Sequence, residues 1–401
     1  MKALITTDEA QAHIDAHLPT FPAIHCPISK CAGRILREFV TADRPLPPFN
    51  RSMMDGYAIR ATEAHQVEAF TITAQAPAGA PAVQLSSQLG SCVEIMTGAV
   101  VPEDADCVVP YEVTTKTDDG RIQLKTPSDH TPGNCIHPLG SDHSEGAELL
   151  SPGCILGSRE IAIAATCGRH TLDVTKMPSI TLVSTGDELV DIDLEPEAHQ
   201  IRRSNDVAIE TALARHQINA RDRIHLPDHR ETSEQQLAEI IQQSNVVIIT
   251  GGVSMGKKDY IPEVLDQLGL VNHFHGVKQK PGKPLGFWTG AHCMVFALPG
   301  NPLSVLASLH RYVIPALIKA MGQSEVAPAT ILKLDSEVRA HDELTFFLPV
   351  KRLPDNIASP QPVQNSGDLV RILASDGFVE LPPAPDRSYP AGTKFAFTPW
   401  S

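Results

Sequence analysis

The stretch NVVIITGGVSMGKKDY, residues 245–260, decides the fold. It opens with an apolar run typical of a strand that is covered on both faces. A glycine-rich turn follows, and a helix is expected from about Tyr260. Ligands of doubly wound sheets bind at the carboxyl ends of the strands. The stretch therefore predicts a parallel α/β sheet with a ligand site at its edge.

The sequence around this stretch repeats the alternation of strand and helix. ITLVST (Ile180–Thr185) and CMVFAL (residues 293–298) predict two more buried strands, and residues 223–226 predict a short one. Helices are expected after Ser204-Asn205, after a capping box at Ser233-x-x-Gln236, and over residues 303–320. Residues 177–325 are therefore expected to form a doubly wound, mostly parallel α/β domain.

The flanking regions have a different character. At about 150 residues per domain, 401 residues predict two to four domains. Residues 42–139 hold short runs rich in Pro, Gly, Thr and Val, which favours an inserted β-rich domain. Residues 1–41 and 140–176 are more helical and are expected to pair as one discontinuous, extended domain. Residues 326–401 again predict short strands, hence a C-terminal β-domain.

Composition excludes several classes of protein. The charge is 33 minus 47, or −14, so the chain is not expected to bind nucleic acid or an anionic membrane. The eight cysteines form no C-x-x-C pair, which favours buried thiols in a reducing compartment over zinc or disulfides. Acidic residues interrupt the apolar residues of the N-terminus, so no signal peptide is predicted. We expect a soluble, cytoplasmic protein.

Three loops at expected strand ends suit an anion. In TGGVSMGKKDY, Gly251, Gly252 and Gly256 allow a tight turn whose N–H groups point at a phosphate, and Ser254 adds a hydroxyl. The simpler interpretation is a βα turn with Asp259 as the helix N-cap.

The second loop, QKPGKP (residues 279–284), brings Lys280 and Lys283 together on a backbone stiffened by proline. Alone it is also compatible with a solvated turn. The third, LPGNPLS (residues 298–304), offers Pro299, Gly300 and Pro302, with Ser304 expected to cap the next helix. Together the three loops predict a pocket for a phosphorylated or oxyanionic ligand.

Carboxylates follow the same strand ends. Glu188 and its neighbour Asp187 come directly after the first predicted strand, and Asp228 follows the short one. With Asp259 they could bind Mg²⁺, which takes a few carboxylates together with ligand phosphates. For each carboxylate alone, a surface or capping role is the favoured interpretation. As a set, they favour metal-assisted phosphoryl or nucleotidyl chemistry.

These segments also resemble a known family. PPFNRSMMDGYAIR, IMTGAVVPEDADCVV, STGDEL, TGGVSMGKKDY, KPGKPLGF and LPGNPLS occur in the order seen in the molybdopterin molybdenumtransferases of the bacterial MoeA type, which are similar to the E domain of gephyrin. The resemblance runs from about residue 35 to 312. It implies a transferase that inserts molybdate into adenylylated molybdopterin, with Mg²⁺-assisted release of AMP.

The resemblance also implies an assembly and a set of site residues. The implied protein is an elongated homodimer with a molybdopterin-binding α/β domain, a dimerisation domain and a C-terminal β-barrel-like domain. Its site lies where the MDGYA segment of one subunit faces the α/β domain of the other. Implied catalytic residues are Asp55, Glu188, Asp228 and Asp259, and implied metal ligands are Asp259, Glu188, Asp228 and Asp142. Implied binding residues are Thr185, Gly186, Ser204, Asn205, Gly251, Gly252, Ser254, Gly256, Lys280, Lys283, Pro299, Gly300 and Pro302.

Some positions depart from the family pattern. Arg203 stands where the family usually has an acidic residue, and Lys257 and Lys258 precede Asp259. Added cations are expected to strengthen anion capture or change the anion that is preferred. Two alternatives stay open at this point: a molybdopterin-binding carrier or scaffold without turnover, and a molybdopterin adenylyltransferase. A transient contact with a separate adenylyltransferase is a further possible partner interaction.

Overall fold

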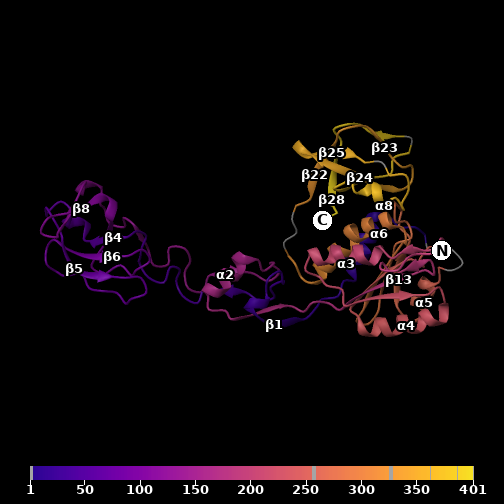
Figure 1. Cartoon of the computed structure of the whole chain (residues 1–401), viewed down its shortest axis with the longest axis horizontal. Coiled ribbons are helices and arrows are strands. Elements are labelled where there is room, and N and C mark those ends of the chain that lie inside the picture. Colours follow the sequence, from indigo (N-terminus) through magenta and orange to yellow (C-terminus); the bar gives the residue numbers. More distant parts are fainter. Residues whose placement is uncertain (1–2, 255–258, 325–327, 362, 386, 401) are drawn as a thin grey trace. The chain divides into compact units, whose positions relative to one another are not determined.

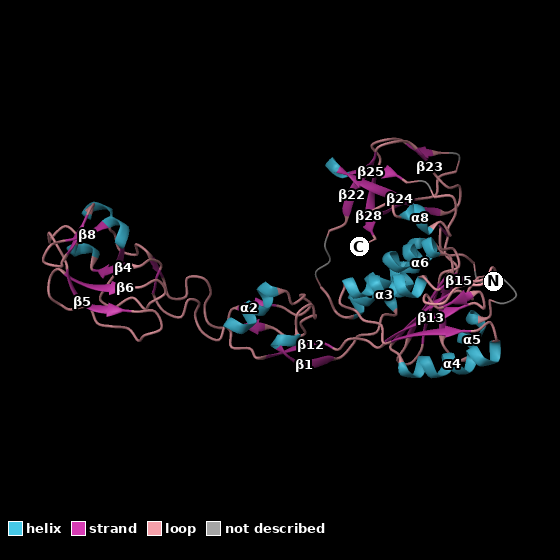
Figure 2. Ribbon diagram, viewed as in Figure 1, coloured by secondary structure: helices cyan, strands magenta, loops and turns pink. Residues whose placement is uncertain are grey.

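The computed structural model describes residues 3–254, 259–324, 328–361, 363–385 and 387–400. Its internal contacts divide the chain into two compact units. Unit 1 comprises Met1–Glu38, Pro152–Ser158 and Thr171–Ser401, and unit 2 comprises Phe39–Ser151 and Arg159–His170. The two units are described separately below, and Figures 1 and 2 show their elements.

A doubly wound sheet lies at the centre of unit 1. Its strand order is β16-β13-β17-β21-β20-β18. The first four strands are parallel, whereas β20 and β18 run antiparallel at one edge. The bounds are β13 Ile180–Thr185, β16 Asp222–Leu226, β17 Val246–Thr250, β18 Val271–His275, β20 Gly286–Thr289 and β21 Met294–Leu298. The predicted parallel α/β architecture is confirmed.

Helices cover both faces of this sheet (Figure 2). Because side chains alternate along a strand, Leu182 and Ile248 pack on one face, and Val183 and Val247 on the other. The first face packs against α3 and the long C-terminal helix, and the second against α4 and α5. The helices are α3 Asn205–Arg215, α4 Arg230–Gln243 and α5 Ile261–Gln267. Strands buried on both faces explain the uninterrupted apolar runs of the sequence.

Two predicted helix starts are wrong. Helix α4 begins at Arg230, capped by the His229 side chain, so Ser233 lies inside the helix and donates its hydroxyl to the Pro227 carbonyl at 3.0 Å. Helix α6 begins at Pro302 with Asn301 as the N-cap, which puts Ser304 within the first turn. In both cases an earlier residue with extended backbone begins the helix, and serine is only a weak signal for the exact start.

The long closing helix is interrupted by a wider turn. Helix α6 (Pro302–Ser308) continues into the π-helical segment η5 (Leu309–Val313) and then into α7 (Ile314–Ala320). Pro315 has no N–H to bond the carbonyl four residues earlier, so an ordinary α-helical ladder cannot continue here. By length and composition, residues Pro302–Ala320 could cross a membrane, but 72% of the most apolar window is buried inside the protein. That burial is typical of a core helix.

The C-terminal region of unit 1 forms a closed five-stranded barrel. Its strands pair in the ring β24-β25-β22-β28-β26, and β26 pairs back to β24. The bounds are β22 Thr330–Leu334, β24 Thr345–Leu353, β25 Ile357–Pro360, β26 Gly377–Leu381 and β28 Lys394–Pro399. The short strand β19 (Gln279–Lys280) adds to β24 in parallel. Helix α8 (Leu369–Ile372) and the strand pair β23 (Val338–Arg339) and β27 (Ser388–Tyr389) complete the region. The predicted barrel-like domain is confirmed.

The N-terminal residues belong mostly to unit 1. Helix α1 (Thr7–Ala16) starts with a capping box between Thr6 and Glu9, and its Ala10 and Ile14 join the core beneath the doubly wound sheet. Strand β1 (Ala23–Pro27) pairs with β12 (Thr171–Thr175), which connects the two segments expected to form one domain. Helix α2 is Ser158–Thr166. The division into four domains stays a prediction.

Unit 2 is built around a four-stranded sheet of order β5-β6-β4-β7. Hydrophobic clusters line it, one around Tyr57 and Phe70 and another around Ala58 and Ile95. The bounds are β4 Gly56–Ile59, β5 Thr71–Ala76, β6 Ser91–Ile95 and β7 Cys107–Pro110. Smaller pairs are β2 (Val40–Thr41) with β11 (Glu148–Leu150), β3 (Arg51–Ser52) with β10 (Ile136–His137), and β8 (Thr114–Lys116) with β9 (Ile122–Leu124).

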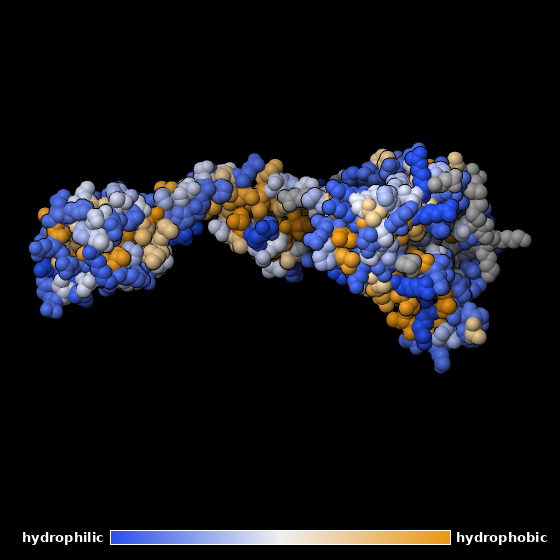
Figure 3. Space-filling view, turned by 90° about the horizontal axis from the view of Figure 1, so that it is seen from above, coloured by the Kyte–Doolittle hydropathy of each residue, from blue (hydrophilic) through white to orange (hydrophobic). Residues whose placement is uncertain are grey.

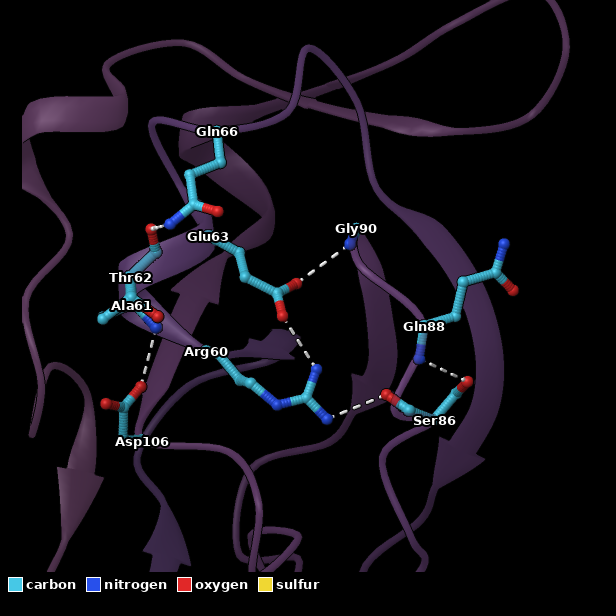
Figure 4. Close-up of polar contacts among 9 residues, drawn as sticks. All are labelled: Arg60, Ala61, Thr62, Glu63, Gln66, Ser86, Gln88, Gly90 and Asp106. Atoms are coloured by element: carbon cyan, nitrogen blue, oxygen red, sulfur yellow. Dashed lines mark hydrogen bonds and ion pairs between the residues drawn. The ribbon is translucent and has the colours of Figure 1, made fainter.

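A buried carboxylate holds the loops of unit 2 together (Figure 4). Glu63 accepts hydrogen bonds from the Gly90 N–H at 2.9 Å and from Arg60 at 2.9 Å. Arg60 also donates to the Ser86 carbonyl at 2.8 Å, and the Asp106 carboxylate accepts from the Ala61 N–H at 2.7 Å. Glu63 is only 7% exposed. Because each buried polar group has a partner, the network is structural.

All eight cysteines are free thiols, and six of them are buried. Burial raises the pKa of Cys92 and Cys293 to about 12, so these thiols stay protonated and unreactive. Large apolar side chains also remain exposed on both units, as the orange areas on a mostly blue surface illustrate (Figure 3). Met53 and Met54 belong to this exposed set, as do Val370 and Leu373.

Candidate functional site

A cavity of about 750 Å³ opens at the carboxyl ends of β13, β17 and β21 in unit 1. This is the edge of the sheet at which doubly wound folds bind ligands. The predicted residues that line it are Thr185, Gly186, Glu188, Ser204, Asn205, Asp228, Gly251, Gly252, Ser254, Asp259, Lys283, Pro299, Gly300 and Pro302. The structure thus brings three distant loops of the sequence to one place.

The glycine turn after β17 is pressed against the end of β13. Gly251 and Gly252 have φ of +87° and +65°, a region that side chains disfavour. A Cβ on Gly251 would lie 2.7 Å from the Thr185 carbonyl oxygen, and one on Gly252 would lie 2.9 Å from Thr185 Oγ1. Both positions therefore require glycine. Ser254 lines the cavity, whereas Gly256, Lys257 and Lys258 lie outside the described residues.

Thr185 supplies a polar atom that the protein does not satisfy. Its side chain is 4% exposed, and Oγ1 has no hydrogen-bond partner among the described residues. Buried hydroxyls are nearly always paired, so an unpaired one on a cavity wall is suited to a ligand oxygen. The neighbouring Gly186 has a φ of +133°, and a Cβ there would meet the Glu188 carboxylate at 2.6 Å.

The third loop is tied to its surroundings by asparagine side chains. Asn205, at the start of α3, donates to the Gly300 carbonyl at 2.7 Å. Asn301 donates to the Ser366 hydroxyl at 2.7 Å, which connects the loop to the barrel region. Ser204 precedes α3 but forms no capping hydrogen bond. These contacts fix Pro299 and Pro302 on the cavity wall.

The two lysines of the second loop are placed differently. Lys283 lines the cavity, but Lys280 is not among the lining residues and lies in strand β19 beside the barrel. Gly282, between them, has a φ of +92° and also lines the cavity. Lys283 is therefore the lysine that the structure places at the cavity.

Carboxylates on the cavity wall come from several loops. Glu188, Asp228 and Asp259 line the cavity, and so does Asp206. Asp187 has a structural contact instead. Its carboxylate accepts a hydrogen bond from the Asp228 backbone N–H at 2.9 Å and so holds the loop that carries Asp228. Within the described parts of the chain, no three His, Cys, Asp or Glu residues form a group that could hold a metal by themselves.

Arg203 does not bring an unbalanced positive charge to the cavity. It lines the wall with a side chain that is 12% exposed, forms an ion pair with Asp191, and lies 4.0 Å from Asp206. Its positive charge and the burial of His225 lower the pKa of that histidine, with burial as the larger cause. The expectation that Arg203 makes the site more positive is therefore weakened by its two acidic neighbours.

Asp55 and Asp142 belong to unit 2. Asp55 accepts hydrogen bonds from the Thr97 N–H at 2.6 Å and the Thr97 hydroxyl at 2.7 Å, which lower its pKa. Asp142 forms an ion pair with His137 at 2.8 Å, and His137 contacts Arg51 at 3.0 Å. Their predicted roles in catalysis and metal binding stay predictions.

Known proteins match the chain along its length. Residues 5–168 match the family model of the MoeA N-terminal region (domain I and II), and residues 181–319 match that of a probable molybdopterin binding domain. A molybdopterin molybdenumtransferase of Synechocystis is 36% identical over 404 residues, which span 99% of this chain and 100% of that protein. The chain belongs to the molybdopterin molybdenumtransferase family.

Two further matches agree with this family. Gephyrin of Dictyostelium discoideum is 33% identical over 337 residues, which cover 74% of this chain and 46% of that protein. The crystal structure of the molybdopterin biosynthesis MoeA protein from Pyrococcus horikoshii superposes with a TM-score of 0.83 at 26% identity, covering 100% of both chains. The fold of this molybdenumtransferase family member is thus that of MoeA.

Sequence reasoning missed several cavity residues of this family member. Ser366 and Gly367 come from a loop of the barrel region. Arg202 lies in the short strand Ile201–Arg202, Asp206 lies in the first turn of α3, and Asn301 belongs to the third loop. The only signal for the barrel loop is the turn-forming sequence Asn-Ser-Gly-Asp at residues 365–368. A turn signal does not tell which strand ends the loop will meet.

Proposed function

We propose that this chain inserts molybdenum from molybdate into adenylylated molybdopterin and releases AMP. Its family membership makes it a transferase of molybdenum cofactor biosynthesis. The observation that carries the proposal is the single cavity at the strand ends, which gathers a glycine turn, a lysine and several carboxylates. That combination of groups is suited to a substrate with phosphates and to an entering oxyanion.

Different cavity residues suit different parts of the two substrates, the phosphates of adenylylated molybdopterin and the molybdate anion. The unpaired Thr185 hydroxyl, beside the Gly251-Gly252 turn, is suited to a phosphate oxygen. The Gly251 N–H donates to the Leu298 carbonyl at 3.1 Å and so holds the turn in place. Lys283 is suited to a tetrahedral oxyanion such as molybdate, because its ammonium offers three donors and a full positive charge. The walls at Pro299 and Pro302 keep the shape of the cavity constant.

The donors present fit a magnesium ion. Mg²⁺ binds proteins through one or two carboxylates and completes its shell with water and substrate phosphates, so a group of three protein ligands is not needed. Glu188, Asp228 and Asp259 are the carboxylates that would hold it. When bound, the ion would neutralise charge on the pyrophosphate link. The protein side chains position that link and keep its leaving phosphate oriented.

The proposal includes a homodimer in the cytoplasm, as in the family. In this arrangement Asp55 of one copy faces the cavity of the other copy, and Asp142 lies near the metal. The exposed Met53 and Met54 beside Asp55 support the idea that this segment meets another surface. Mixing Asp55→Ala protein with Asp259→Ala protein tests it, since heterodimers would contain one intact site and regain turnover.

The decisive experiment measures AMP release from adenylylated molybdopterin by the purified protein. We expect release that depends on both molybdate and Mg²⁺. Tight binding without release would overturn the proposal in favour of a carrier, and formation of adenylylated molybdopterin from ATP would favour an adenylyltransferase. A carrier that only holds its ligand is favoured by added cations such as Arg203. The ion pairs of Arg203 with acidic residues weaken this alternative.

A further inference from the structure

The loop that carries Lys283 is held from beneath by two buried side chains. Gln279 and Tyr312 are each 0% exposed. The Tyr312 hydroxyl donates to Gln279 Oε1 at 2.7 Å, and Gln279 Nε2 donates to the Gly282 carbonyl at 3.2 Å. Gly282 directly precedes Lys283. A chain of hydrogen bonds therefore runs from the long helix to the backbone carbonyl of the residue before the cavity lysine.

The geometry around Gly282 leaves little room for another position of this loop. With a φ of +92°, Gly282 has a backbone conformation that side chains rarely adopt. A Cβ there would lie 2.6 Å from Gln279 Nε2 and 2.9 Å from Ser308 Oγ. The loop is thus packed directly on Gln279 and on the helix that carries Ser308.

The wider turn of the helix places Tyr312. Tyr312 lies in the π-helical segment η5, next to Arg311. Arg311 forms an ion pair with Glu380 of the barrel at 2.5 Å and donates to Gln11 of α1 at 2.7 Å. Arg311 thus ties the π-helical segment to the barrel and to α1. Because the segment is held at both contacts, the Tyr312 hydroxyl has a fixed position beside Gln279.

The rest of the loop is anchored as well. The Val277 N–H donates to the Lys283 carbonyl at 2.8 Å, and the Leu285 N–H donates to the Gly282 carbonyl at 3.2 Å. Strand β19, which includes Gln279, pairs with barrel strand β24. Without the Gln279 side chain, the Gly282 carbonyl would keep the Leu285 N–H as a donor and would lose its connection to Tyr312.

We propose that Tyr312 and Gln279 are positioning residues that set the place of Lys283 for binding the oxyanion substrate. This inference rests on the function proposed above for Lys283. Neither residue touches the cavity, since neither is among its lining residues. They act through the Gly282 carbonyl, and a structural role alone would affect stability without changing substrate binding.

Tyr312→Phe and Gln279→Met remove the hydrogen bonds while keeping the side-chain volume. In each variant we expect the molybdate concentration for half-maximal rate to rise roughly 3- to 10-fold, the equivalent of one hydrogen bond. The limiting rate should change much less. The double variant should be no worse than Gln279→Met, because both changes break one chain.

Hydrogen exchange of the Val277 and Leu285 amides is a readout that needs no turnover. We expect both amides to exchange faster in the two variants, and Tyr389→Phe to leave them unchanged. Tyr389 is a matched control, because its hydroxyl donates to the Pro382 carbonyl at 3.0 Å and its ring lies outside the cavity lining. If Gln279→Met does not fold, Tyr312→Phe decides alone.

The outcomes separate this inference from the proposed function. Unchanged amide exchange and an unchanged molybdate requirement would overturn the positioning role. A lower melting temperature with unchanged exchange in the loop would also overturn it, since it would show a purely structural role. If the unmodified protein shows no molybdate-dependent turnover, the proposed function fails, while the exchange measurement still decides whether these residues hold the loop.

Discussion

Lys283 is the residue at which charge and position matter most. It is the PGKP lysine at the cavity, so Lys283→Ala should raise the molybdate concentration for half-maximal rate roughly tenfold, about 1.4 kcal/mol of lost charge-assisted binding. Steady-state kinetics with varied molybdate measures this. Lys351→Ala removes an exposed lysine of the barrel and should leave the kinetics unchanged. A loss of thermal stability alone would make Lys283 structural.

Substitution of Asp259 tests the proposed role of the cavity carboxylates in binding Mg²⁺. It lies half-buried on the wall just before α5, whose N-cap is Tyr260, so it does not occupy the capping position. Asp259→Ala should abolish Mg²⁺-dependent AMP release, because a metal bound through one or two carboxylates loses a large part of its protein ligands. Circular dichroism should show an intact fold. Asp342→Ala, at an exposed barrel position, is the control, and an unchanged rate in Asp259→Ala would remove Asp259 from the metal site.

At the residue scale, the sequence identified much of the cavity because glycine and proline constrain the backbone. The conformational freedom of Gly251 and Gly252 predicts a tight turn, and both residues have positive φ where they pack against Thr185. The environment of Arg203 could not be predicted from the sequence, because an arginine does not constrain the backbone as glycine and proline do. Its ion-pair partner Asp191 lies 12 residues earlier, outside any helix or strand, where no periodic pattern predicts a contact between the two side chains.

At the element scale, the Glu63 network stabilises unit 2. Glu63 is nearly buried, and it satisfies the Gly90 N–H and Arg60. Glu63→Ala leaves the Gly90 N–H without its partner and leaves Arg60 with only the Ser86 carbonyl, so it should lower the free energy of unfolding by roughly 2–3 kcal/mol. Thermal or urea unfolding measures this. Glu68→Ala, at an exposed position in the same segment, should cost much less, and equal losses in the two variants would contradict the network's role.

Prediction of elements was accurate where one local signal dominates. The apolar runs at Ile180–Thr185 and Val246–Thr250 predict two strands, because runs this short are typical of strands that are covered on both faces. The starts of α4 and α6 were wrong, since several nearby residues can begin a helix. The π-helical segment was missed because its cause, a proline within a tertiary-packed helix, leaves the hydrophobic pattern unchanged.

At the scale of the whole molecule, His310 should make unit 1 sensitive to acid. Burial, with smaller effects from His216 and Arg215, lowers the pKa of His310 to about 4, and its ring packs against Trp400 of the C-terminus at 5.8 Å. The unfolded chain therefore binds more protons between about pH 6.5 and pH 4. Stability contributed by His310 is present above this window and is lost as the pH falls through it.

His310→Phe removes this titration and keeps a ring against Trp400. Between pH 7 and pH 4.5 the unmodified protein should lose roughly 2–3 kcal/mol more stability than the variant. Burial raises the pKa of Glu380, which opposes the trend, but that group is the same in both proteins. Denaturant unfolding at both pH values measures the difference. Equal acid sensitivity would show that His310 does not titrate in this range.

The closure of the C-terminal barrel is also a property of the whole chain that local sequence does not predict. Short strands over residues 326–401 predict a β-domain, but the ring closes through β24 and β26, which β25 and α8 separate along the chain. Closure depends on pairings between distant segments, which local patterns do not encode. The same holds for Ser366, which reaches the cavity only because the barrel packs beside the third loop.

The two units should unfold as separate cooperative steps. The clusters around Tyr57 and Ala58 lie wholly within unit 2, and the large cluster beneath the doubly wound sheet lies within unit 1. Cooperative units follow shared cores, so differential scanning calorimetry should resolve two transitions. Glu63→Ala should lower only one of them, by several degrees. His310→Phe should change the acid dependence of only the other, and a single transition that both substitutions shift would show that the two cores unfold as one.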